Sequence, residues 1–172
     1  MKRIVPLLFL LVAAASLPAE KTAWAFRTGI NLTPGLVYNR VWDPGYNGSA
    51  LTVMSLRQNG GFILGGGIEA GYNYTGFNLH FPLRAGLTVA GGDSLTLSAN
   101  LDLMPGLILG IPASYFLFAL EASMEAVWQV SPCLGISLSA GPRYTVSPGY
   151  GEAVSPLEFI DLTVGLAAVM GN

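Results

Sequence analysis

Hydrophobic and polar residues alternate along most of this chain, a pattern that predicts β-strands rather than helices. In the clearest example, apolar Phe77, Leu79 and Phe81 are interleaved with polar Asn78 and His80. Eight segments show this alternation, although the second is short and weak and the third is rich in glycine. The eight candidate strands cover 26–39, 50–57, 64–74, 77–89, 94–106, 115–129, 133–145 and 157–170.

Turn-forming residues separate the candidate strands. Gly, Pro, Asn and Asp gather between them, where they provide the backbone conformations that end strands. Many short strands with even spacing and Gly-rich turns predict a closed sheet or a sandwich. The sequence pattern does not show the alternation of strands with helices that would indicate a Rossmann-like fold. Turns are expected at 43–45, 59–61, 75–76, 91–93, 110–112, 131–132 and 147–149.

A helical hairpin is an alternative interpretation for 104–120, a run of seventeen residues without a charged side chain. Gly110 and Pro112 stand in the middle of this run, and both residue types interrupt helices. Alternation continues on both sides of them. The pattern therefore favours a strand, a turn and a second strand.

The first 25 residues have the pattern of a secretory signal peptide. Two basic residues precede an apolar run from Ile4 to Leu17, and small residues follow it. The run is shorter than the roughly 20 apolar residues that a membrane-spanning helix needs. Cleavage is expected after Ala19 or after Ala25, and residues 26–172 are expected to form one domain.

Composition narrows the class of protein. Charged residues make up 10% of the chain, against roughly 25% in ordinary soluble domains, while hydrophobic residues reach 52% and the mean hydropathy is +0.53. This balance is hard to reconcile with a water-soluble globule. Eight Lys and Arg residues exclude a protein that follows a nucleic-acid backbone. The lone cysteine, Cys133, excludes a disulfide framework and a multi-cysteine zinc site.

The kinds of residue on the two faces of the strands indicate which face meets lipid. The polar row consists mostly of small residues, which suit the narrow lumen of an eight-stranded barrel. The apolar row is bulky and nearly free of charge, as a lipid-facing surface must be. A soluble lipocalin-like barrel would instead turn its apolar row inward. The sequence therefore predicts an all-β fold: a closed, antiparallel, up-and-down transmembrane β-barrel of eight strands.

Aromatic residues support this orientation because membrane barrels carry aromatic girdles at both rims. If the strands run up and down, the aromatic side chains fall near two levels. One rim would carry Tyr38, Trp42, Tyr72, Tyr74, Phe77, Phe116 and Tyr144, and the other Phe26 and Trp128.

The chain after the signal peptide resembles the small eight-stranded bacterial outer-membrane barrels of the OmpA, OmpX and OmpW kind. The segments 81–86 (FPLRAG) and 139–144 (SAGPRY) look like strands of these proteins. The resemblance implies a location in the bacterial outer membrane, with its lipid and its assembly machinery as partners. The chain departs from the family at its end, because Met170-Gly171-Asn172 replaces the usual terminal aromatic residue.

Charged residues in the middle of strands fall in the row that faces the lumen. Counting along the predicted hairpins places Arg84 diagonal to Glu69, Asp102 nearly opposite Glu121, and Arg143 roughly diagonal to Asp161. We therefore expect a network in which each arginine bridges two carboxylates, with a structural or a conducting role. The expected network consists of Glu69, Arg84, Asp102, Glu121, Arg143 and Asp161, together with His80.

No catalytic, cofactor or metal site is expected. His80 is the only histidine, so the chain cannot build a two-histidine metal site, and a Ser-His triad has little support. Gly65-Gly66-Gly67 lacks the lysine that follows a phosphate-binding loop. The chain is therefore not expected to be an enzyme.

The function expected from these features is that of an integral outer-membrane barrel with a filled or very narrow lumen and a structural or surface role. Three alternatives remain open: a narrow porin-like channel for small solutes, a surface adhesin or host-factor binder, and a soluble secreted lipocalin-like carrier. No nucleic-acid partner is expected, and the pattern identifies no particular surface ligand.

Overall fold

The computed structural model describes residues 23–38, 41–43, 48–73, 76–109, 115–147 and 157–171. Most of the predicted signal peptide, residues 1–22, lies outside the described residues. Among the described residues, no helix is long and apolar enough to cross a membrane.

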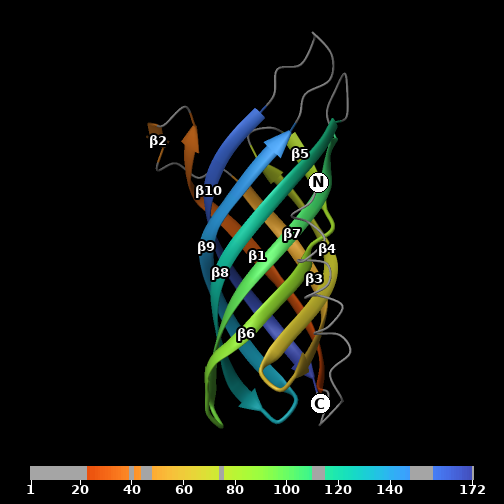
Figure 1. Cartoon of the computed structure of the whole chain (residues 1–172), viewed down its shortest axis with the longest axis vertical. Helices are drawn as coiled ribbons and strands as arrows, with labels where there is room; N and C mark the ends of the chain where they lie inside the picture. The colour runs from red at the N-terminus through yellow and green to blue at the C-terminus, as the bar shows by residue number, and fades with distance from the viewer. Residues whose placement is uncertain are drawn as a thin grey trace, which may run out of the picture.

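The chain forms one antiparallel sheet that closes on itself, because β10 pairs with β1 (Figure 1). The strands are β1 (Ala23–Tyr38), β2 (Val41–Asp43), β3 (Gly48–Asn59), β4 (Phe62–Asn73), β5 (Gly76–His80), β6 (Leu83–Gly91), β7 (Leu95–Leu109), β8 (Tyr115–Ser131), β9 (Leu134–Ser147) and β10 (Leu157–Gly171). β5 and β6 share one place between β4 and β7, and within the described residues β2 pairs only with the end of β1. The wall therefore has eight positions, which confirms the predicted eight-stranded barrel.

The strand expected over 77–89 is interrupted at Phe81 and Pro82. Proline has no backbone N–H and cannot donate to the ladder of a sheet. Two backbone hydrogen bonds close the wall at this point: Gly67 N donates to Pro82 O at 3.0 Å, and Phe81 N donates to Pro105 O at 2.8 Å. The interruption changes the local pairing and leaves the barrel continuous.

Two uncertain segments of the sequence are strands. The weak candidate at 50–57 is part of β3, whose twelve residues pair with both β1 and β4. The helical hairpin considered for 104–120 is not formed in its described parts, since 104–109 belong to β7 and 115–120 to β8. Alternation was the better guide in both cases.

The apolar row faces outward and the polar row faces the lumen, as predicted. On β6, Leu83 is 56% exposed and Val89 62%, whereas Arg84 between them is 5% exposed. The buried side chains are accordingly mostly polar, which is the reverse of a soluble protein. The apolar-inward arrangement of a lipocalin-like carrier is not found among the described residues.

Two charged side chains mark the limits of the apolar outer band. Near one rim, the guanidinium of Arg57 lies 5.8 Å from the centre of the Trp24 ring. At the other rim, the Tyr144 hydroxyl donates to the exposed Glu158 at 2.8 Å. The distance from Glu158 to Met170 is twelve residue steps, which at ~3.3 Å each and a tilt of ~40° rise about 30 Å, enough for an outer-membrane apolar band of about 25 Å.

The predicted girdle aromatics whose side chains are described are all exposed on the outer face. These are Tyr72, Phe77, Phe116, Tyr144, Phe26 and Trp128. Trp24 joins the lower group, while the side chains of Tyr38, Trp42 and Tyr74 lie outside the described residues. We use "upper end" for the end that carries β2 and "lower end" for the end that carries Gly171 (Figure 1).

Short turns connect the strands at the lower end. Gly60 and Gly61 both have positive φ, 54° and 89°, which glycine adopts without strain and which suits a two-residue hairpin. Cys133 is exposed in the turn between β8 and β9, with its Sγ 3.8 Å from Ser131 Oγ. Cys133 therefore lies at the rim, away from the lumen charges.

Glycines on the lumen face allow close approach of neighbouring side chains. A Cβ atom added to Gly67 would meet Met54, whose Cα and Cγ would both lie at 2.8 Å. The adjacent Gly66 faces outward, and a Cβ there would find its nearest atoms at 3.7 Å. Two neighbouring glycines thus have opposite steric surroundings.

We predict that Gly67→Ala destabilises the barrel by about 1–3 kcal/mol because of overpacking, whereas Gly66→Ala is nearly neutral. Urea unfolding of the refolded protein in detergent, followed by the loss of heat-dependent gel mobility, measures both variants against the unaltered chain. Equal stability of the two variants would contradict the assignment of lumen and lipid faces at this site.

Residues on both sides of the second candidate cleavage site are part of the wall. Ala23, Trp24 and Ala25 pair with residues of β3, and Ala25 also lies opposite Gly171. Cleavage after Ala25 would remove these paired residues from β1. Cleavage after Ala19 would retain them.

We therefore expect the mature chain to begin at Glu20. N-terminal sequencing of protein purified from the membrane fraction, or its intact mass, measures this directly. A mature chain that begins at Phe26 would show that the described start of β1 is dispensable for the barrel.

Candidate functional site: the charged lumen

A guanidinium group crosses the lumen in its upper half. Arg143 on β9 donates from Nη1 to Glu69 Oε1 at 2.8 Å and from Nη2 to Glu69 Oε2 at 3.2 Å. Its Nε donates to Glu121 Oε2 on β8 at 2.8 Å. β9 and β4 lie on opposite sides of the eight-position wall, so the pair of Arg143 with Glu69 links opposite walls. We call Glu69, Glu121 and Arg143 the upper ion cluster.

Polar side chains from other strands complete the surroundings of Glu69. Asn31 Nδ2 donates to Glu69 Oε2 at 2.6 Å, and the Thr52 hydroxyl donates to the same oxygen at 3.0 Å. His80 Nδ1 lies 3.4 Å from Glu69 Oε1, and His80 is directly opposite Glu69 in the pairing of β4 with β5. This carboxylate is 1% exposed and is compensated by several donors, as a buried charge requires.

A second cluster occupies the lumen below the first. Arg84 on β6 contacts Asp102 on β7 through two bonds, Nε to Oδ1 at 2.8 Å and Nη2 to Oδ2 at 2.7 Å. The remaining nitrogen, Nη1, donates to Glu125 Oε2 at 2.8 Å. The paired bonds to Asp102 have the two-pronged geometry that favours arginine with a carboxylate.

Arg27 and Glu125 belong to this network, although they are not among the network residues predicted from the sequence. Arg27 Nε on β1 donates to Glu125 Oε1 at 2.8 Å, and Arg27 Nη2 donates to Ser139 Oγ at 3.3 Å. Both residues occupy the lumen-facing row of their strands, so parity could have identified them. We call Arg27, Arg84, Asp102 and Glu125 the lower ion cluster.

In the structure Arg84 and Arg143 each bind two carboxylates. For each arginine, however, one of the two predicted carboxylate partners is wrong. Arg84 does not contact Glu69, because the last pair of the hairpin between β4 and β5 is Asn73 with Gly76 and places Arg84 opposite Gly65. The predicted turn at 75–76 was one residue too late, which shifts the register by two. Glu125 takes the place of Glu69 beside Arg84.

The predicted contact of Arg143 with Asp161 is also not formed as an ion pair. The two residues are directly opposite each other in the pairing of β9 with β10, rather than diagonal. Even so, Arg143 donates to Glu69 and Glu121, and Asp161 Oδ1 is buried without a hydrogen-bond partner in the described part of the chain. Asp102 is directly opposite Glu121, which joins the two clusters side by side.

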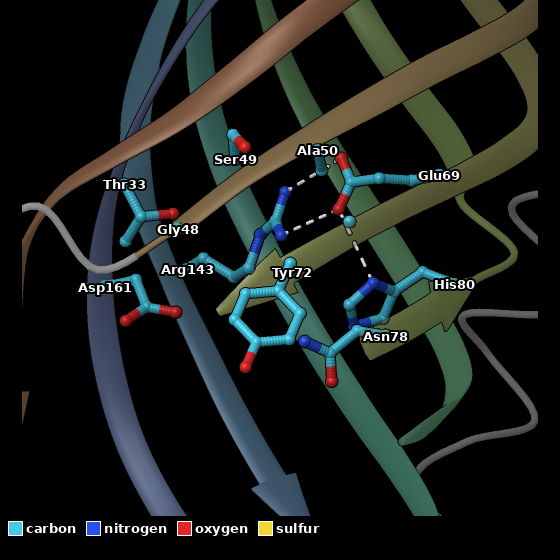
Figure 2. A pocket seen from close by; sticks show the side chains of 11 residues that line it. Thr33, Gly48, Ser49, Ala50, Glu69, Tyr72, Asn78, His80, Arg143 and Asp161 are labelled. Carbon is cyan, nitrogen blue, oxygen red and sulfur yellow. Dashed lines mark hydrogen bonds and ion pairs between the residues drawn. The ribbon is translucent and has the colours of Figure 1, made fainter. Parts of the chain in front are cut away.

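The lumen is hollow at both ends and filled between them. At the lower end a cavity of about 210 Å³ is lined by apolar Leu56, Ile63 and Val127 and reaches inward to Glu125. At the upper end a cavity of about 30 Å³ reaches Glu69, Arg143 and Asp161 (Figure 2). Between the two clusters lies a cavity of about 10 Å³, roughly the room of one water molecule.

Within the described residues, no group of three or more His, Cys, Asp and Glu side chains could hold a metal ion. The carboxylates of both clusters face guanidinium groups instead. Charge compensation between side chains is therefore the chemistry that this arrangement provides.

Comparison with known proteins supports the fold. No protein-family model and no curated protein matches the chain. Among solved structures, the chain is similar to the crystal structure of Neisserial surface protein A, with a TM-score of 0.58 and 12% identity over 88% of this chain and 99% of that chain. The chain has the fold of a small outer-membrane β-barrel. The predicted resemblance is thus confirmed for the architecture.

A structure from the de novo design of transmembrane β-barrels is also similar, with a TM-score of 0.47 and 9% identity over 86% of this chain and 95% of that chain. At these identities the likeness does not extend to activity or ligands. The lumen of this transmembrane barrel must therefore be interpreted from its own side chains.

We predict that Arg84→Met destabilises the barrel by about 3–5 kcal/mol, because it leaves Asp102 and Glu125 with an uncompensated buried charge. Arg57→Met is the matched control at the outer rim, where loss of the contact with Trp24 should cost about 1 kcal/mol or less. Urea unfolding in lipid vesicles measures both. Similar small effects in the two variants would show that the lower ion cluster contributes little to stability.

Proposed function

We propose that this chain is an integral protein of the bacterial outer membrane, with a side-chain-filled lumen and a structural or surface role. The filling of the lumen carries the proposal. Arg143 links opposite walls, and Arg84 and Arg27 both bind Glu125 below it. The cavity between the two clusters has a volume of only about 10 Å³. A passage for solutes would require these ion pairs to separate.

The outer surface supports the proposed location. An apolar band of about 30 Å between the levels of Glu158 and Met170 suits insertion into lipid. Partners of such a protein are the lipid of the outer membrane and the machinery that assembles barrels into it. The proposal includes no catalytic step and no cofactor.

A narrow channel for small solutes is the second candidate, favoured by the cavities at both ends of the lumen. Both cavities end at the ion clusters, so conduction would depend on the opening of these clusters. The two candidates therefore differ in whether the clusters stay closed in the membrane.

Planar-bilayer recording separates them. We expect no discrete conductance steps from the refolded unaltered chain, and small steps from Arg84→Ser and Arg143→Ser, because each substitution removes a guanidinium group that fills the lumen. Arg57→Ser, at the outer rim, is the control and should behave as the unaltered chain does.

Conductance steps of the same size in the unaltered chain and in the lumen variants would overturn the filled-lumen proposal in favour of the channel. Recovery of the protein in the soluble periplasmic fraction, without heat-dependent gel mobility, would overturn the proposed location. Each variant is recorded only after heat-dependent mobility shows that its barrel is folded.

A further inference from the structure

The lumen row changes character near the lower end of the barrel. Around the ion clusters the lumen-facing side chains are mostly polar. Below them, four neighbouring strands present apolar residues to the lower cavity: Val169 on β10, Ala25 on β1, Leu56 on β3 and Ile63 on β4. We call these four residues the apolar arc.

The apolar arc is continuous along the wall. Ala25 and Leu56 are paired directly across β1 and β3. Leu56 and Ile63 are diagonal neighbours in the pairing of β3 with β4, as are Ala25 and Val169 in the pairing of β1 with β10. Side chains in these relations lie about 5–8 Å apart on one face of a sheet, so the arc forms one apolar surface.

The opposite side of the cavity is more polar. β7 and β8 lie across the eight-position wall from β1 and β3. Their uncharged residues at the cavity are Thr96, Ser98, Val127 and Gln129. Gln129 Nε2 donates to the backbone oxygen of Ser131 at 2.7 Å, which leaves the side-chain oxygen of Gln129 as an acceptor. The cavity thus has one apolar side and one side with neutral polar groups.

The charge of the cavity is already balanced. Among the described residues that line it, Glu125 is the only one with a charged side chain. The two oxygens of Glu125 accept from Arg27 and Arg84, and the lower ion cluster has as many arginines as carboxylates. A charged ligand would enter without a counter-charge, which costs far more than the entry of a neutral group. The electrostatics therefore favour a neutral occupant.

The volume of the lower cavity, about 210 Å³, sets the size of the occupant. A dry cavity of about 150 Å³ lined by aliphatic side chains is large enough for benzene. Water is less suited to the space beside the apolar arc, because an ordered water molecule needs about two to four polar partners. A compact organic molecule fits both the volume and the lining.

We propose that the lower cavity binds a small neutral molecule with an apolar body the size of a benzene ring and a hydroxyl group. The apolar body lies against the apolar arc, and the hydroxyl group faces the side formed by β7 and β8. Removal of the arc from water provides the favourable free energy of binding. The molecule stays below the ion clusters, so the inference goes beyond the proposed function and requires only a folded barrel.

Two isoleucines on β4 distinguish binding in the cavity from partition into detergent. Ile63 belongs to the apolar arc, whereas Ile68 is 52% exposed on the outer face. Protein with isotope-labelled isoleucine δ1 methyl groups is refolded in deuterated detergent, and the two resonances are assigned with Ile63→Val and Ile68→Val. Benzyl alcohol, benzoate and benzylammonium, which share one ring and differ in charge, are titrated in parallel at neutral pH.

We expect benzyl alcohol to shift the Ile63 resonance to saturation and the Ile68 resonance only in proportion to its concentration. Benzoate and benzylammonium should bind at least about tenfold more weakly, since each brings an unbalanced charge into the cavity. Val127→Phe, which fills the cavity with a ring of its own, should abolish the saturable shift. Val53→Phe, the same substitution on the outer face of β3, is the control and should bind as the unaltered chain does.

Shifts of Ile63 and Ile68 that are both proportional to concentration would overturn the proposal and show that the probe only partitions into detergent. Equal saturation by all three probes would overturn the preference for a neutral molecule. Saturation that persists in folded Val127→Phe would place the bound molecule outside the lower cavity. If this variant does not fold, as judged by heat-dependent gel mobility, Thr96→Phe on β7 takes its place.

Discussion

The ion pair of Arg143 with Glu69 links opposite walls of the barrel, and the rest of the lumen is arranged around contacts of this kind. A buried guanidinium group is tolerated only when carboxylates and further hydrogen bonds surround it. Asn31 and Thr52 provide such bonds to Glu69, and Glu121 binds the same arginine from a neighbouring strand. The polar interior thus acts as the core of the protein.

This arrangement depends on the narrowness of an eight-position wall. The lumen row accommodates large side chains beside very small residues, such as Gly67, which is paired with Met54 on the neighbouring strand. Gly165 has a similar place, since a Cβ there would meet Arg27 Nη2 at 3.2 Å. Glycines on the lumen face therefore leave space that the neighbouring arginine side chains need.

The fold could be predicted from the sequence because each strand repeats the same two-residue pattern over many positions. The site could be predicted only in part. Parity assigned Arg84 to the lumen, but its partners depend on the hairpin register, and an error of one residue in the turn replaced Glu125 by Glu69. Contacts between strands that are not neighbours, such as Arg143 with Glu69, cannot be obtained by counting along hairpins. They follow from barrel closure, which sequence spacing does not specify.

The bond between Arg27 and Glu125 joins the first strand of the barrel to one that follows 98 residues later. β1 and β8 are not neighbours in the wall, so this bond becomes possible only when the sheet has curled into its final shape. A partly assembled sheet without β1 would leave Glu125 with Arg84 but without Arg27. The lower ion cluster therefore favours complete closure over stable intermediates and couples the last step of assembly to the electrostatics of the interior.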